Sequence, residues 1–132
     1  MKLQNLHLAV GAIGLVVFAV QGHFMDTTLG VSNLPDGPRL MYRTAHLYLM
    51  MASVINILMA LLPTESGSGW RARLVTLCGL VFLVAPFLFL LSFIIESNDP
   101  QFMRPITVFT HYGVFGAGAL LVLLEVQRRL AR

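Results

Sequence analysis

The chain has 132 residues, of which 57% are hydrophobic and only 11% are charged, and its formal net charge is +3. Soluble domains carry about 25% charged residues, so this composition excludes an ordinary soluble domain and indicates a membrane protein. The apolar residues form four long runs, which leave no room for a separate soluble domain.

Each run is long enough for a helix that crosses a bilayer, because the hydrocarbon core needs roughly 20 residues. We predict spans at about residues 6–24, 40–62, 74–95 and 106–126. In the first span, Gly11 and Gly14 share a face and would let a neighbouring helix approach closely. The connection that follows is rich in Gly, Pro, Asp and Asn, which predicts turns folded over the end of the bundle.

The orientation follows from the positive charges flanking the spans. One side would carry three arginines, Arg39, Arg43 and Arg104, and the other side the remaining six basic residues, Lys2, Arg71, Arg73, Arg128, Arg129 and Arg132. We therefore predict an all-α, up-down-up-down transmembrane bundle with both termini in the cytoplasm. In a bacterium it would be a multi-pass protein of the inner (plasma) membrane. The rule also accounts for the net charge without a nucleic-acid partner.

Two histidines lie inside the predicted spans at matched depth. His46 is six residues into the second span and His111 is five residues into the fourth. At 1.5 Å of rise per residue, each lies roughly 8 to 9 Å below the outer boundary of the hydrocarbon. Ionisable groups in such positions usually face the bundle interior and indicate a functional site. The second and fourth helices would run in the same direction and lie on the diagonal of the bundle.

This pair predicts a b-type haem with His46 and His111 as its axial ligands. Arg43 and Arg104 lie outward of the two histidines and would meet the haem propionates. Covalent attachment is excluded because the chain has one cysteine and no CxxCH motif. The predicted function is that of a small cytochrome-b-like electron carrier that passes electrons to or from a quinone or an outer acceptor. In architecture alone, the chain resembles small four-helix membrane cytochromes.

Two other ligands fit the same end of the bundle. A transition metal ion (Cu, Zn or Fe) would take His23, His46, Glu96 and His111, with Asp26 as a further candidate. A quinone or lipid head group would instead use the polar face of the second span, which carries Arg43, His46, Ser53 and Asn56.

In a simpler interpretation, the histidines and the other polar side chains only stabilise the packing of the helices. The histidines would then bond across helices, and His7 and His23 would be ordinary residues near the two interfaces. The protein would be a non-catalytic accessory or assembly subunit that packs against other membrane subunits or a second copy in the bilayer. The sequence leaves open whether the protein is an enzyme.

Overall fold

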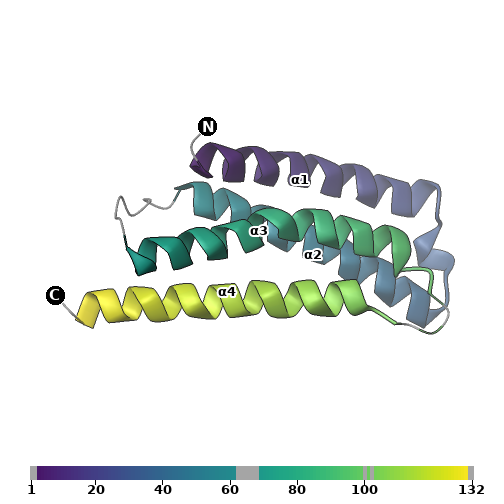
Figure 1. Ribbon diagram of the computed structural model, residues 1–132. Coiled ribbons are helices and arrows are strands. Elements are labelled where there is room, and N and C mark those ends of the chain that lie inside the picture. The colour runs from purple at the N-terminus through teal and green to yellow at the C-terminus, as the bar shows by residue number, and fades with distance from the viewer. Residues whose placement is uncertain (1–2, 62–68, 100, 102, 131–132) are drawn as a thin grey trace.

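The computed structural model describes residues 3–61, 69–99, 101 and 103–130, and this part of the chain is almost entirely helical (Figure 1). Long α-helices form α1 (Leu3–Thr27), α2 (Asp36–Leu61), α3 (Trp70–Ile95) and α4 (Pro105–Leu130). A short 3-10 helix, η1 (Val31–Asn33), lies between α1 and α2. Pro105 begins α4, where a proline's missing N–H and fixed φ cost nothing.

By length and composition, each of the helices α1 to α4 can cross a membrane. The protein is therefore a multi-pass integral membrane protein with an all-helical bundle, as the sequence predicts. The predicted spans lie inside the observed helices, which continue about one further turn beyond most of them. Residue 62, the last of the second predicted span, lies outside the described residues.

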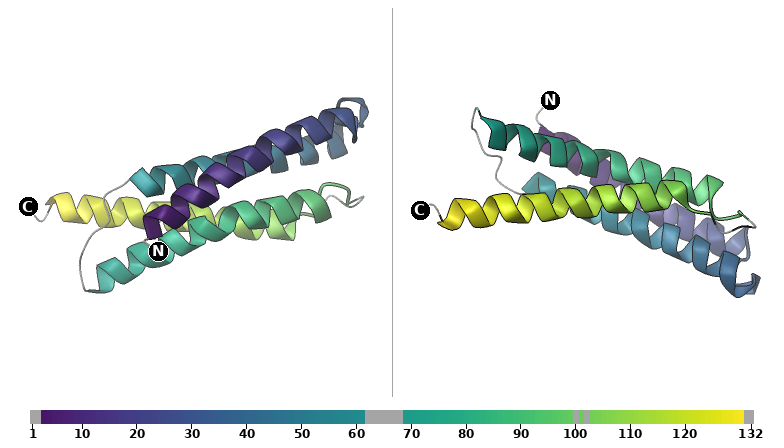
Figure 2. Two further views of the ribbon diagram at one scale, coloured as in Figure 1. Left: turned by 90° about the horizontal axis from the view of Figure 1, so that it is seen from above. Right: turned by 60° about the horizontal axis from the view of Figure 1, so that its bottom comes forward.

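The helices alternate in direction, so the α1–α2 and α3–α4 connections lie at the end opposite the two termini (Figure 1). We call this the outer end, following the orientation predicted from the charges. α2 and α3 are central, with α1 packed on α2 and, less extensively, on α3, while α4 packs principally on α3 (Figure 2). α2 and α4 run in the same direction, as predicted, but α1 and α4 lie on opposite sides instead of closing a square.

Glycines on α1 set the close approach of α1 to α2. A Cβ atom on Gly11 would lie 2.7 Å from Cγ1 of Ile57 and 2.8 Å from the carbonyl oxygen of Ser53. Gly14 lies directly against the Ser53 hydroxyl. A larger residue at Gly11 would collide with the backbone of α2, and one at Gly14 would collide with the Ser53 side chain. These contacts confirm the role expected from the glycine spacing.

The α1–α2 connection covers part of the outer end. Gly30 has a φ of 56°, a left-handed conformation that favours glycine, and it starts the turn of η1. The next residue, Val31, is buried against Met25, Ala45 and Phe93. The loop is therefore part of the outer core, as its turn-rich sequence predicts.

A proline in α3 is compensated by a side chain from α2. Pro86 has no N–H, so the carbonyl of Phe82, four residues earlier, loses its helical donor. Asn56 Nδ2 donates to this carbonyl oxygen at 2.7 Å and also to the Ala52 carbonyl oxygen at 2.9 Å. In hydrocarbon every backbone group needs a protein partner, so Asn56 ties α2 to α3 at the point where α3 is weakest.

Candidate functional site

His46 of α2 packs against α1. Its imidazole stacks on the ring of Phe18, with centroids 4.0 Å apart and planes inclined by 14°. Nδ1 lies 2.9 Å from Oε1 of Gln21, and Nε2 lies 3.3 Å from the position that a Cβ on Gly22 would take. Phe18, Gln21 and Gly22 of α1 therefore surround this imidazole, and the stacking and the hydrogen bond fix its orientation.

His111 of α4 has different surroundings. Its ring meets Tyr48 of α2 edge-on, with centroids 5.0 Å apart, and lies 4.8 Å from the ring of Phe115. The described part of the chain provides no hydrogen bond to either of its ring nitrogens. His111 is thus half-buried among aromatic rings with two unused polar atoms.

The two imidazoles face different sides of α2. His46 and Tyr48 are two residues apart, which turns their side chains roughly 200° from one another around the helix. The His46 ring contacts α1, whereas the Tyr48 ring contacts α4 through His111 and α3 through Phe89. The structure therefore does not bring the two predicted haem ligands together across one space.

A second contact joins α2 to α4 nearer the outer end. Arg104, the residue before α4, donates from Nη1 to Oγ1 of Thr44 at 2.6 Å. The Thr44 hydroxyl itself donates to the carbonyl oxygens of Leu40 and Met41. Tyr48 lies one turn below Thr44 on α2, so the polar groups of Thr44, Tyr48, Arg104 and His111 form one strip, which we call the outer seam.

Of the other predicted metal ligands, His23 and Glu96 are not placed to share an ion. His23 is exposed on α1. Glu96 is buried and caps the first turn of α4: Oε1 accepts from the Ile106 N–H, and Oε2 accepts from the N–H and hydroxyl of Thr107 at 3.1 and 2.6 Å. Within the described residues, no group of three or more His, Cys, Asp or Glu side chains is arranged to hold a metal ion.

The remaining predicted propionate partner, Arg43, is exposed at the outer end of α2. Of the polar residues predicted on α2, Ser53 donates to its own helix at the Leu49 carbonyl oxygen, 2.7 Å away. The Asn56 amide donates to the Phe82 carbonyl oxygen of α3. The expected quinone pocket on this face of α2 is therefore filled by helix contacts in the described structure.

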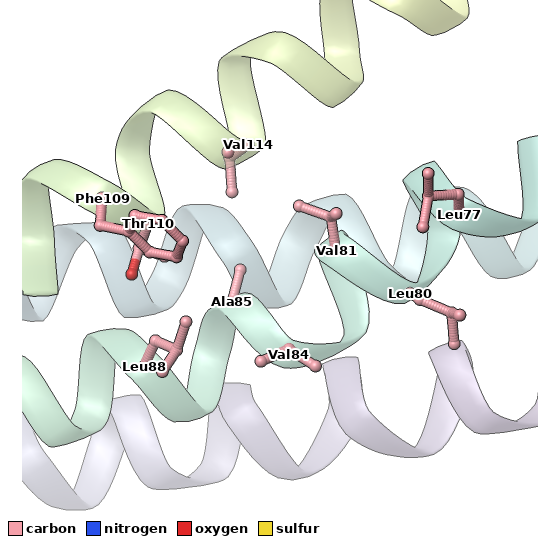
Figure 3. Close-up of a pocket in the computed structure, with 10 residues that line it drawn as sticks. Leu77, Leu80, Val81, Val84, Ala85, Leu88, Phe109, Thr110 and Val114 are labelled. Atoms are coloured by element: carbon pink, nitrogen blue, oxygen red, sulfur yellow. The ribbon is translucent and has the colours of Figure 1, made fainter. Parts of the chain in front are cut away.

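An apolar groove of about 340 Å³ lies between α3 and α4 (Figure 3). Phe109 and Gly113 of α4 line it, together with aliphatic residues of α3 that include Leu80 and Val84. Its one hydroxyl, on Thr110, donates to the Ile106 carbonyl oxygen at 2.7 Å. Phe109 is turned roughly 200° from His111 on α4, so the groove is separate from the outer seam.

Sequence reasoning missed His7 and underrated Tyr48 and Thr44. His7 is 2% exposed, and its Nδ1 lies 2.7 Å from Oδ1 of Asn56. Its position near a helix end suggested a solvated residue, although His7 lies one turn before Gly11 on the face of α1 that packs on α2. Tyr48 and Thr44 lie one turn apart on the helix that carries His46, so a helical-face analysis centred on Tyr48 would have found both.

The fold and the outer seam define a four-helix integral membrane protein in which polar groups lie between two helices that run in the same direction, and some of these groups have no partner among the described residues. Comparison with protein-family models, with curated proteins and with solved structures found no match for this chain.

Proposed function

We propose that this protein is a small membrane protein of electron transport that binds a quinone in the outer seam. The observation that carries the proposal is His111, a half-buried histidine inside a spanning helix whose ring nitrogens have no hydrogen-bond partner among the described residues. A polar group of this kind in hydrocarbon is costly without a ligand or a task. We place the protein in a bacterial inner membrane, with the outer end facing the periplasm.

The chemistry of the seam suits a quinone ring. A neutral imidazole offers one N–H, which can donate to a quinone carbonyl, and one lone pair, which can accept a proton from a quinol hydroxyl. The rings of Tyr48 and Phe115 on either side of His111 offer flat apolar surfaces for an aromatic head group. His111 is therefore the residue that binds the head group and exchanges its proton.

A b-type haem remains a second candidate cofactor, supported by one specific relationship. Arg104 and His111 are seven residues apart, so they lie on nearly the same side of α4, roughly 10 Å apart along its axis. This arrangement offers a nitrogen ligand for the iron and a guanidinium for a propionate. His46 does not join this set while its ring stays against Phe18 and Gln21.

The experiment purifies the protein in a mild detergent, records visible spectra before and after dithionite, and measures extracted quinones by mass spectrometry. We expect near-stoichiometric quinone with the wild-type protein and with His46→Ala, and loss of quinone with His111→Ala. A Soret band that sharpens on reduction and disappears in His111→Ala would identify haem instead. Folded protein with neither quinone nor haem would contradict the redox proposal.

A second candidate function is that of a subunit of a larger membrane complex. α4 exposes large apolar side chains that include Phe109, beside the groove it shares with α3, and Tyr112, each 76% exposed. Near them, a Cβ on Gly116 would meet nothing within 4 Å among the described residues. The test is cross-linking in native membranes from a cysteine placed at Tyr112: a larger partner would support the subunit role, and monomer alone would contradict it.

A further inference from the structure

The guanidinium of Arg104 has one occupied side and one unpaired edge. Nη1 donates to Thr44, whereas Nε and Nη2 are buried and have no hydrogen-bond partner among the described residues. The N–H groups of Nε and Nη2 point in parallel along one edge of the planar group. This edge is the fork that binds two oxygens of a carboxylate or a phosphate at once.

The carboxylates that the structure describes near the outer end have other partners or lie in solvent. Both oxygens of Glu96 are taken by the first turn of α4. Asp36 pairs with Arg39, and Asp99 accepts from the backbone N–H of Gln101. Asp26 is exposed on α1. Burial of a cation without a counter-charge costs free energy. An anion from outside the chain, bound at the Arg104 fork, would supply the missing counter-charge.

We propose that Arg104 binds a phosphate group at the outer membrane surface, through Nε and Nη2. Arg104 directly precedes α4, which places it where the spanning helix meets the head-group layer. Arg43, exposed beside Thr44 on α2, adds a second positive charge at this level. The phosphate belongs either to a phospholipid head group or to a free ion.

This inference does not depend on a quinone at His111. A haem propionate would present similar oxygens to the same fork, and the visible spectrum described above distinguishes that case. The phosphate site is therefore tested on protein without a Soret band, by a measurement that reports lipid binding and not electron transfer.

The experiment measures bound lipid by native mass spectrometry of delipidated protein titrated with phosphatidylglycerol. Digalactosyldiacylglycerol, which has no phosphate, is the lipid control, and inorganic phosphate is the competitor. We expect Arg104→Gln to weaken phosphatidylglycerol binding by about tenfold or more, since a charged hydrogen-bond pair is lost. Arg104→Lys keeps the charge but not the fork and should fall below the wild type. Arg39→Gln is the matched control, because Arg39 already pairs with Asp36.

Competition by millimolar inorganic phosphate would identify a free ion as the source, and its failure to compete would identify the lipid head group. Equal binding of the galactolipid and phosphatidylglycerol would overturn the proposal. An Arg104→Lys variant that binds phosphatidylglycerol as tightly as the wild type would also overturn the proposal. This variant provides the test if Arg104→Gln does not fold.

Discussion

His7 of α1 and Asn56 of α2 are joined by a contact of 2.7 Å between Nδ1 and Oδ1, and the other contacts of Asn56 determine its direction. Asn56 Nδ2 donates to the carbonyl oxygens of Ala52 and Phe82, so Oδ1 is the atom that faces His7. His7 Nδ1 is therefore the donor. In the neutral ring Nε2 then carries the lone pair, and it is buried 3.2 Å from the position of a Cβ on Gly79.

Asn56→Leu should destabilise the bundle, because the Phe82 carbonyl and His7 Nδ1 would both lose their partner. We expect a loss of about 1–3 kcal/mol in the free energy of unfolding, the usual cost of a buried polar group left unpaired. The measurement is unfolding in mixed detergent micelles, followed by circular dichroism.

Pro86→Ala supplies the control for this prediction. Alanine restores an N–H to residue 86, so the Phe82 carbonyl regains a donor within α3. The cost of Asn56→Leu should therefore be smaller in the Pro86→Ala background. Strict additivity of the two substitutions would show that Asn56 and Pro86 are not coupled through this carbonyl.

Gly11→Ala and Gly116→Ala should differ sharply in their effects. A methyl group at Gly11 meets the backbone of α2, whereas one at Gly116 meets nothing within 4 Å in the part of the chain described. We expect Gly11→Ala to lower the free energy of unfolding by about 1–3 kcal/mol, as overpacking does. Gly116→Ala should leave it unchanged or raise it slightly, since alanine favours helix. The measurement is thermal unfolding of both variants. Equal changes in stability would contradict the close packing of α1 on α2 at Gly11.

Glu96→Gln should loosen the start of α4. The carboxylate accepts two backbone N–H groups of the first turn and the Thr107 hydroxyl, and an amide has only one oxygen for these donors. We expect a loss of about 1 kcal/mol, typical of a helix cap, and faster amide hydrogen exchange at residues 106 and 107. Asp99→Asn, a half-buried carboxylate in the same loop that does not contact α4, is the control. Unchanged exchange in Glu96→Gln would contradict the capping role.

His46→Ala and His111→Ala should differ in stability, because His46 has a structural role and His111 is proposed to bind a ligand. His46 has a stacked ring and a hydrogen-bond partner, so its removal should cost about 1 kcal/mol of unfolding free energy. Removal of His111, which has no hydrogen bond within the described chain, should change stability less in ligand-free protein. The reverse order of stabilities would indicate that His111 is the structural residue of the two.

The sequence predicted the spans, the alternation of the helices and the close contact at Gly11, because these depend on composition and on small residues along one face. The sequence also predicts a similar depth for His46 and His111 in the membrane, which stays a prediction. It could not give the rotation of each helix about its axis, and that rotation separates the two rings: His46 turns to α1 and His111 to Tyr48. The sequence showed that Pro86 removes one N–H from the third span. It could not show that Asn56, which lies 30 positions away on another helix, replaces this donor.

The bond between Asn56 and the Phe82 carbonyl has a consequence for how the protein assembles after synthesis. Each helix is apolar enough to enter the bilayer alone, but an isolated α3 would carry an unsatisfied Phe82 carbonyl in the hydrocarbon. In an isolated α2, the Asn56 amide would bond only to the Ala52 carbonyl of its own helix. Docking of α2 on α3 gives the Phe82 carbonyl its donor, and His7 contacts the amide oxygen from α1. The Phe82 carbonyl of α3 is therefore satisfied only once α2 is docked on it, so α3 depends on α2 for its stability in the bilayer.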